Sequence, residues 1–207
     1  MNILGNKLTL RAVEEKDLEL LHKWSNDPDT QNIIGDIHFP SSMAYHKLWF
    51  EKLSNDQLNQ RFAIDAPEIG IIGLSSIINI DWRNNHAWHG IMLGDVDIRG
   101  KGFGIDAVMA TMRYAFDELH LERLDGSMIE YNDISLGFYC NKLGWKEEGR
   151  RRNYYFRRGR YWDQVVVGIT KEDYIQLIEK NIYLNRIRSN RSLRPLEKNS
   201  KEGGDLS

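Results

Sequence analysis

A glycine-rich loop that leads into a long amphipathic helix constrains the fold of this chain more than any other feature. Residues 86–94 have the pattern of a β-strand, and the loop Arg99-Gly100-Lys101-Gly102-Phe103-Gly104 follows shortly after. Over residues 102–119, apolar side chains recur at spacings of three and four, which predicts a helix with one apolar face. A strand, a tight loop and a helix in this order indicate a domain in which helices pack on a sheet.

The same loop has the properties of an anion-binding site. Glycines let the backbone turn tightly and approach a ligand. Backbone N–H groups at a helix N-terminus favour a pyrophosphate, and Arg99 and Lys101 add formal positive charge. The spacing fits neither the dinucleotide fingerprint nor the P-loop, but it fits Arg-x-x-Gly-x-Gly. The alternative is a tight strand-to-helix connection that binds nothing.

Hydrophobic periodicity predicts the other elements. The segments with strand character are residues 8–13, 61–65, 69–80, 86–94, 123–129, 145–150 and 164–169. Helices are predicted after residues 14–17, after residues 40–42, over 102–119, over 133–143 and after Thr170. The basic, aromatic segment 151–162 joins the last two strands, and Gly159 suits a hairpin turn within it.

Composition excludes several classes of protein. The 207 residues are 41% hydrophobic and 28% charged, which is typical of a globular domain. The formal net charge of -2 gives no general attraction to nucleic acid or membranes. Because Cys140 is the only cysteine, an intramolecular disulfide and a thiolate-rich metal site are both excluded. The N-terminus has no signal-peptide pattern and no apolar run is long enough to span a bilayer, so we expect a cytoplasmic protein.

The composition changes near the end of the chain. We expect one domain over residues 1–184. Residues 185–207 are polar and poor in apolar side chains, so a disordered tail is expected there.

Two segments resemble the GNAT superfamily of N-acetyltransferases. GIMLGDVDIRGKGFGIDAV, residues 90–108, resembles its coenzyme A-binding core, and residues 132–169 are similar to the end of that domain. The subgroup that the chain resembles holds ribosomal-protein N-terminal acetyltransferases and spermidine-type acetyltransferases. The resemblance implies an α/β (α+β) fold with a mixed, mostly antiparallel sheet, splayed in the middle and flanked by helices. It also implies an enzyme that uses acetyl-CoA as cosubstrate, without a metal.

The resemblance assigns cofactor contacts to three segments. Ile91, Met92 and Leu93 would offer backbone groups to the pantetheine arm, and one N–H would face the thioester oxygen. Asn132 and Ser135 would contact the cofactor, with helix capping as the alternative. The pyrophosphate would be held by the backbone of Arg99, Gly100, Lys101, Gly102, Phe103 and Gly104.

The resemblance also points to an acid and a base. Counted from Asn132, Tyr139 is the family's tyrosine, which protonates the leaving thiolate. Counted back from Gly144, that position is Cys140, so this helix carries one extra residue. Relatives often have a glutamate base where this chain has Trp88. His89 is the candidate base here, and a chain of water molecules is the alternative.

The acceptor implied by the resemblance is a primary amine, either a small molecule or a protein N-terminus. It would be recognised by residues 24–40 and 153–162, and a homodimer through a late exposed strand is one option. A non-catalytic acyl-CoA-binding module is an alternative function. Another is a ribosome- or RNA-binding protein that uses the arginines of Arg150–Arg160, although the balanced net charge makes nucleic acid an unfavoured partner.

Overall fold

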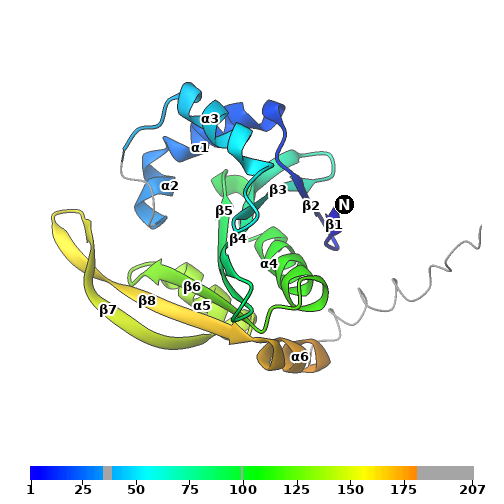
Figure 1. Cartoon of the computed structure of the whole chain (residues 1–207). Coiled ribbons are helices and arrows are strands. Elements are labelled where there is room, and N and C mark those ends of the chain that lie inside the picture. Colours follow the sequence, from blue (N-terminus) through cyan, green and yellow to red (C-terminus); the bar gives the residue numbers. More distant parts are fainter. Residues whose placement is uncertain (35–38, 99, 181–207) are drawn as a thin grey trace, which may run out of the picture.

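The computed structural model describes residues 1–34, 39–98 and 100–180. Eight strands form one sheet in the order β1-β2-β3-β4-β5-β6-β8-β7 (Figure 1). Neighbouring strands are antiparallel except β5 and β6, which are parallel. The predicted mixed, mostly antiparallel sheet flanked by helices is therefore confirmed.

Most predicted helices and strands begin and end within two residues of the observed ones. The strands are β1 (Ile3–Leu4), β2 (Thr9–Ala12), β3 (Gln60–Ala66), β4 (Gly70–Asp81), β5 (His86–Leu93), β6 (Arg123–Ile129), β7 (Lys146–Arg157) and β8 (Arg160–Thr170). The α-helices are α1 (Leu18–Ser25), α2 (Pro28–Ile33), α3 (Met43–Leu53), α4 (Phe103–Arg113), α5 (Asp133–Gly137) and α6 (Lys171–Lys180). Two of them, β1 and α2, were not predicted.

The unexpected helix α2 starts at a sequence that usually ends one. Asp27 accepts a hydrogen bond from Thr30 N at 2.8 Å, and Pro28 occupies the first helical position. An aspartate cap followed by proline is a strong helix start. The segment that closes α1 therefore opens the next helix at once.

The sheet opens in the middle because β5 and β6 pair over only a short stretch. Their register joins His86, Ala87 and Trp88 to Arg123, Leu124 and Asp125. Beyond this point β5 stays with β4, while β6 stays with β8 along its whole length. The two halves of the sheet therefore separate into two arms, as the family resemblance implied.

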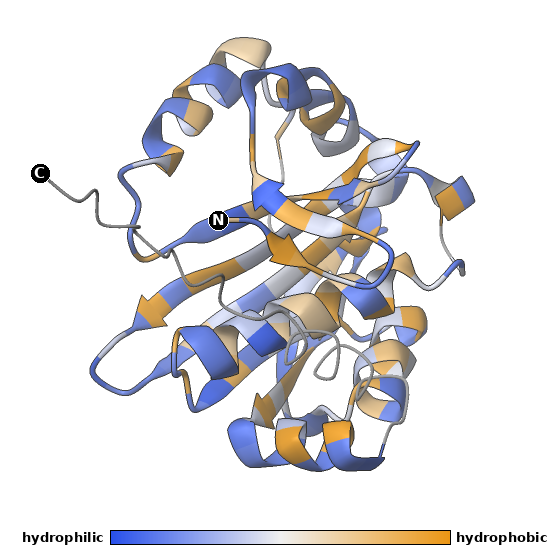
Figure 2. Ribbon diagram, turned by 90° about the vertical axis from the view of Figure 1, so that its right-hand side faces the viewer, coloured by the Kyte–Doolittle hydropathy of each residue, from blue (hydrophilic) through white to orange (hydrophobic). Residues whose placement is uncertain are grey.

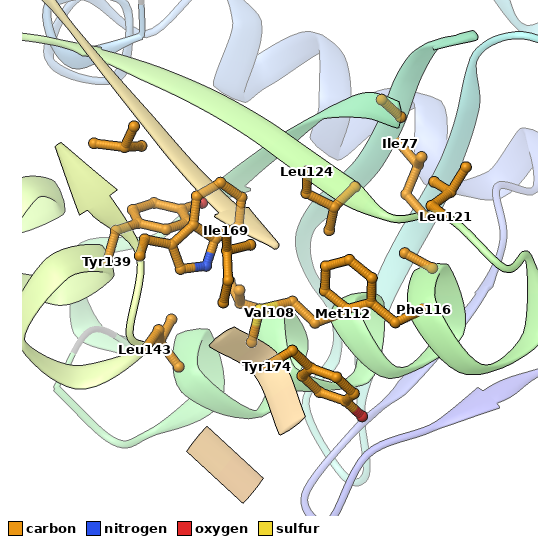
Figure 3. Packing of buried hydrophobic residues seen from close by; sticks show 14 of the residues in the cluster. Ile77, Val108, Met112, Phe116, Leu121, Leu124, Tyr139, Leu143, Ile169 and Tyr174 are labelled. Carbon is orange, nitrogen blue, oxygen red and sulfur yellow. The ribbon is translucent and has the colours of Figure 1, made fainter. Parts of the chain in front are cut away.

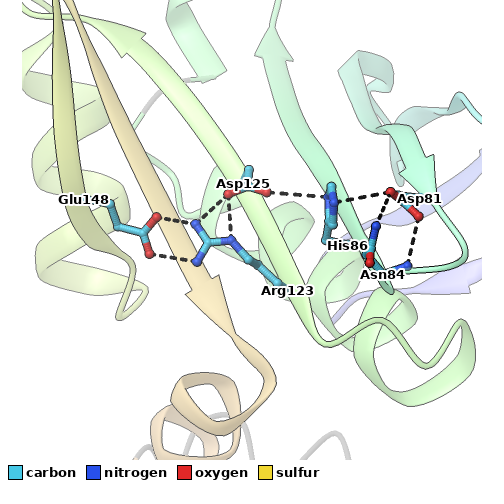
Figure 4. A network of polar contacts seen from close by, with 6 residues as sticks. All are labelled: Asp81, Asn84, His86, Arg123, Asp125 and Glu148. Carbon is cyan, nitrogen blue, oxygen red and sulfur yellow. Dashed lines mark hydrogen bonds and ion pairs between the residues drawn. The ribbon is translucent and has the colours of Figure 1, made fainter.

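A polar network holds the arms together where they are still paired (Figure 4). Arg123 donates to Asp125 through Nε at 2.8 Å and to Glu148 through Nη1 at 2.9 Å. His86 lies between Asp125 and Asp81, at 3.9 and 3.7 Å. Residues of β4, β5, β6 and β7 are thus connected at the closed end of the sheet.

The largest core lies between the sheet and the helices α4, α5 and α6. Val108, Met112 and Phe116 of the α4 region pack against Leu124 of β6 (Figure 3). Hydrophobic and hydrophilic residues alternate along the strands and helices, as expected for elements with one buried face (Figure 2). Among the described residues, no helix is long and apolar enough to cross a membrane.

The late strands form one long hairpin with Gly159 in its turn, as predicted. The expectation that residues 151–162 only connect the two strands is wrong, because both strands extend into this segment. β7 and β8 pair from Lys146↔Gly168 to Arg157↔Arg160. The turn residues Arg158 and Gly159 have φ of 53° and 74°, and a two-residue type I′ hairpin turn requires such positive values at both positions. The basic residues lie on the strand itself. Residues 185–207, expected to be a tail, lie outside the described residues.

Candidate active site

A cavity of about 1010 Å³ opens where β5 and β6 separate. We call it the cleft. Its walls come from β5, β6, the first turn of α4, α5, the end of α2 and the β7–β8 hairpin. Ile91, Met92 and Leu93 all line it, as predicted. Within the described chain, no strand pairs with this part of β5 on the side of β6, so backbone N–H and C=O groups face the cleft.

The glycine loop lies at the start of α4 and forms an open cradle. Gly100 and Gly102 have φ of 78° and 86°, a left-handed conformation that favours glycine. Gly102 is the N-cap of α4, so the N–H groups of the first turn are available to an anion. Gly100, Gly102 and Gly104 line the cleft.

The other residues of the loop have different positions. Phe103 packs against the buried cluster that holds Leu10 and Ile64, so its backbone rather than its ring is offered to a ligand. Lys101 is exposed. Arg99 lies outside the described residues.

A lysine from the N-terminus lies beside this cradle, and sequence reasoning missed it. The Lys7 ammonium donates to Lys101 O at 3.0 Å. The turn between β1 and β2 is fixed to α4 because the buried Asp106 accepts from Asn6 N at 2.8 Å and from Lys7 N at 2.7 Å. An aspartate on the otherwise apolar face of the predicted helix was the available signal.

Asn132 and Ser135 line the cleft, and the Asn132 side chain also makes a helix cap. Its Oδ1 accepts from Ser135 N at 3.1 Å, and its Nδ2 donates to Ile33 O at 3.4 Å. Tyr131 OH donates to Asn32 O. The end of α2 is therefore bound to the opposite arm across the cleft.

Tyr139 lies in the wall of the cleft within a π-helical turn, Phe138–Lys142. A π-turn holds one residue more than an α-turn. This accounts for the two conflicting counts along this helix. Cys140 lies outside the cleft lining and packs, half-buried, against the core, where burial raises the pKa of its thiol.

Tyr139 is only 7% exposed, and burial raises the pKa of its hydroxyl well above the ordinary value of about 10. The group is therefore protonated at neutral pH and can act as a proton donor. Its ring contacts His89 and Trp145, with centroids 6.0 and 5.0 Å away.

His89 lies beside Tyr139 and is held as a neutral imidazole. Its Nδ1–H donates to Ser76 O at 3.1 Å, while Nε2 is buried without a hydrogen-bond partner among the described residues. Burial lowers the pKa of His89 to about 4. The neighbouring residue on β5, Trp88, also lines the cleft.

A polar cluster lies on the part of the cleft formed by the hairpin. Gln164 donates through Nε2 to Ser127 Oγ at 3.0 Å and to Tyr155 OH at 2.8 Å. Arg151 Nη1 donates to Gln164 Oε1 at 3.1 Å. Tyr154 completes this wall.

The aromatic candidates for acceptor binding are dispersed. Trp24 belongs to the core under Gly94, and its Nε1 donates to Asp95 at 3.3 Å. Trp162 contacts Tyr131. Phe39, Phe156 and Tyr161 are exposed and do not line the cleft. His38 and Asp36 lie outside the described residues.

Comparison with known proteins identifies the family. The family described as Acetyltransferase (GNAT) domain matches residues 7–146. The chain belongs to the GNAT acetyltransferases. The relatives of this acetyltransferase support both the predicted enzyme class and the predicted subgroup.

The curated relatives cover most of the chain. An SPbeta prophage-derived uncharacterized N-acetyltransferase, YokL of Bacillus subtilis, is 28% identical over 82% of this chain and 93% of its own length. The spermidine N(1)-acetyltransferase of Vibrio cholerae is 26% identical over 85% of this chain and 100% of its own. The ribosomal protein uS5-alanine N-acetyltransferase of Escherichia coli is 29% identical over 53% of this chain and 56% of its own.

A solved structure has the same fold. It is a spermidine N-acetyltransferase from Vibrio cholerae in complex with CoA and spermine, with a TM-score of 0.76 and 26% sequence identity. The similarity covers 83% of this chain and 99% of that one.

Proposed function

We propose that this acetyltransferase moves an acetyl group from acetyl-CoA to a primary amine by direct attack in a ternary complex. The observation that carries the proposal is the cleft between β5 and β6, with the Gly100–Gly104 cradle at one end and Tyr139 in its wall. Two of the relatives named above act on spermidine and on the alanine of a ribosomal protein, and both are amine acceptors.

The chemical groups of the donor, acetyl-CoA, match the backbone groups that the cleft offers. The cradle offers N–H groups to the pyrophosphate, and the unpaired edge of β5 offers hydrogen bonds to the amide groups of the pantetheine arm. A β5 N–H that faces the thioester oxygen would stabilise the negative charge that develops there. Asn132 and Ser135 would extend these contacts at the start of α5.

In the chemical step the amine nitrogen attacks the thioester carbon, and the carbon–sulfur bond breaks. Tyr139 donates its proton to the thiolate that leaves. A base with a pKa of about 4 cannot readily deprotonate an ammonium with a pKa near 10. We therefore assign removal of the amine proton to a chain of water molecules that passes it out to bulk solvent rather than to His89, which shapes the wall beside Tyr139.

Calorimetric titration with acetyl-CoA tests the donor site. The wild type should bind, and Gly102→Glu should not, because a carboxylate at the cradle repels the pyrophosphate. Gly70→Glu is the matched control, since Gly70 also has a left-handed φ of 87° but does not line the cleft. Retained binding by this control separates repulsion from backbone strain.

A panel of primary amines with detection of free thiol then tests the reaction. Release of coenzyme A that depends on one amine supports the proposal. If the wild type does not bind acetyl-CoA, the proposal fails. If it binds but no amine is acetylated, the non-catalytic module is favoured.

A further inference from the structure

The hairpin side of the cleft presents one guanidinium group, which is hydrogen-bonded to a buried amide. Gln164, only 5% exposed, supports it: both hydrogen bonds of its Nε2 go to Ser127 and Tyr155, at 3.0 and 2.8 Å. Its carbonyl oxygen is thereby directed at Arg151, whose Nη1 donates to it at 3.1 Å. A buried amide with all these partners is held in place, so the oxygen that accepts from Arg151 has a fixed position.

Arg151 retains most of its donors for a ligand. Its guanidinium also lies 5.7 Å from the centre of the Tyr154 ring. A guanidinium has five N–H groups in a planar fork that fits a carboxylate, and the described contacts use one of them. Arg151 lines the cleft, so the remaining donors are accessible from it.

The position of the cluster assigns it to the acceptor rather than to the donor. Side chains alternate along β6, and Met128 packs in the core with α4. Ser127 therefore points to the opposite face of the sheet. Gln164, which is hydrogen-bonded to Ser127, and Arg151, which is hydrogen-bonded to Gln164, lie on the same face as Ser127. The donor cradle is at the start of α4, on the other side of this gap.

The charge of the cleft favours an anionic group near the amine. Among the described lining residues, Asp133 is the only acid, and the positively charged residues are Lys142 and Arg151. Asp133 belongs to α5, next to the residues assigned to the donor. On the acceptor side, a polycation would meet the fixed charge of Arg151.

We propose that the acceptor is an amine that carries a carboxylate, and that Arg151, positioned by Gln164, binds this carboxylate. A free amino acid and a peptide N-terminus next to an acidic residue share this chemistry. The inference rests on the proposed function. It predicts that this chain differs from the Vibrio cholerae relative, whose named substrate, spermidine, has only basic nitrogens.

The test measures kcat/KM for matched acceptors with the wild-type enzyme. One pair is a short peptide with glutamate at its second position and the same peptide with lysine there. The other acceptors are free glutamate and spermidine, so that the two sources of a carboxylate are distinguished. At least one carboxylate-bearing acceptor should exceed both the lysine peptide and spermidine by about tenfold or more.

Variants of the cluster show whether Arg151 is responsible. Arg151→Gln should abolish the preference mainly through KM, and Arg151→Glu should reverse it in favour of the lysine peptide. Gln164→Leu should weaken the preference through KM without changing acetyl-CoA binding. Gln164→Glu should weaken it further, because a carboxylate beside Arg151 neutralises the charge that the acceptor would meet. Arg152→Gln is the control, since the neighbouring Arg152 is equally exposed but does not line the cleft.

The outcomes are distinguishable. A preference for spermidine in the wild type, or an unchanged preference in Arg151→Glu, overturns the inference and leaves the proposed function intact. If no amine is acetylated, the proposed function fails, and the inference fails with it.

Discussion

At the scale of single residues, burial determines the protonation of the two side chains that we propose lie at the reaction centre. Tyr139 and His89 lie side by side, and burial shifts their pKa values in opposite directions. Both shifts favour the neutral form. The centre therefore presents a hydroxyl that keeps its proton and an imidazole that does not take one.

Replacing Tyr139 tests its role as the acid. Tyr139→Phe keeps the ring and should lower kcat by roughly 10²-fold, with little change in the Kd of acetyl-CoA. Cys140→Ala is the control, because Cys140 is the competing position in the sequence count and does not line the cleft. Equal losses in both variants would show that the effect comes from helix packing. Steady-state kinetics and calorimetry provide the two readouts.

Burial of neutral His89 makes stability depend on pH. The unfolded chain binds this proton near pH 6.5, whereas the folded protein binds it near pH 4. The free energy of unfolding is therefore highest above pH 6.5. It decreases by up to about 3 kcal/mol as the pH falls toward 4.

Urea unfolding at several pH values measures this dependence. His89→Gln should flatten the curve between pH 6.5 and 4. His46, whose pKa burial also lowers, is present in both proteins and cancels in the difference. Parallel curves for wild type and variant would contradict the prediction.

At the scale of elements, the turn between β1 and β2 supplies charge to the cradle that α4 begins. Lys7 should add electrostatic attraction to a phosphate of acetyl-CoA. Lys7→Met should raise its Kd about fivefold, the value expected for roughly 1 kcal/mol at an exposed ion pair. The Kd of acetyl-pantetheine, which lacks the nucleotide, should not change.

Lys16→Met is the control for the loss of one positive charge, because Lys16 lies in the 3-10 turn before α1, whereas Lys7 Nζ donates to Lys101 O in the cradle. An equal effect of the two variants would assign the change to net charge. Isothermal titration at low and moderate salt gives both comparisons.

Local periodicity predicted the long elements and missed the short ones. The 102–119 helix and the β6 strand follow from the spacing of their apolar residues. β1 has only two residues, and α2 is shorter than two turns, so neither leaves a periodic signal. The only sign of the π-turn in the sequence was that counting forward from Asn132 and counting back from Gly144 gave different residues, Tyr139 and Cys140, for the same position.

The arrangement of the site depended on contacts that the sequence does not show. The resemblance predicted the cradle and the exposed edge of β5, because both are continuous in sequence. Lys7 reaches the cradle only because Asp106 holds the N-terminal turn. Gln164 meets Arg151 through the register of β7 with β8, which the predicted linker over 151–162 concealed.

At the scale of the whole molecule, the two arms of the sheet are joined at one end by the Arg123 network and across the cleft by the end of α2. Arg123→Met should reduce the free energy of unfolding by about 1 to 2 kcal/mol, less than for a fully buried pair because Arg123 is 33% exposed. Urea denaturation measures the change, and Arg152→Met is the exposed control.

The contribution of this network should also depend on pH. Arg123 lowers the pKa of Glu148, so the stabilisation is present above the unfolded pKa of about 4.3 and is lost as the pH falls below it. The difference in stability between the wild type and Arg123→Met should therefore shrink in acid. A constant difference would exclude Glu148 as the relevant partner.

The arginine-rich strand β7 has a consequence for the behaviour of the protein at high concentration. β7 is the last strand of the described sheet, and its outer edge offers unpaired backbone groups to any other strand. Charged side chains along such an edge oppose the addition of a second molecule and so limit aggregation. The side chains that would have this effect are those of Arg150, Arg152 and Arg157. Replacing all three by neutral residues should make the protein aggregate more readily.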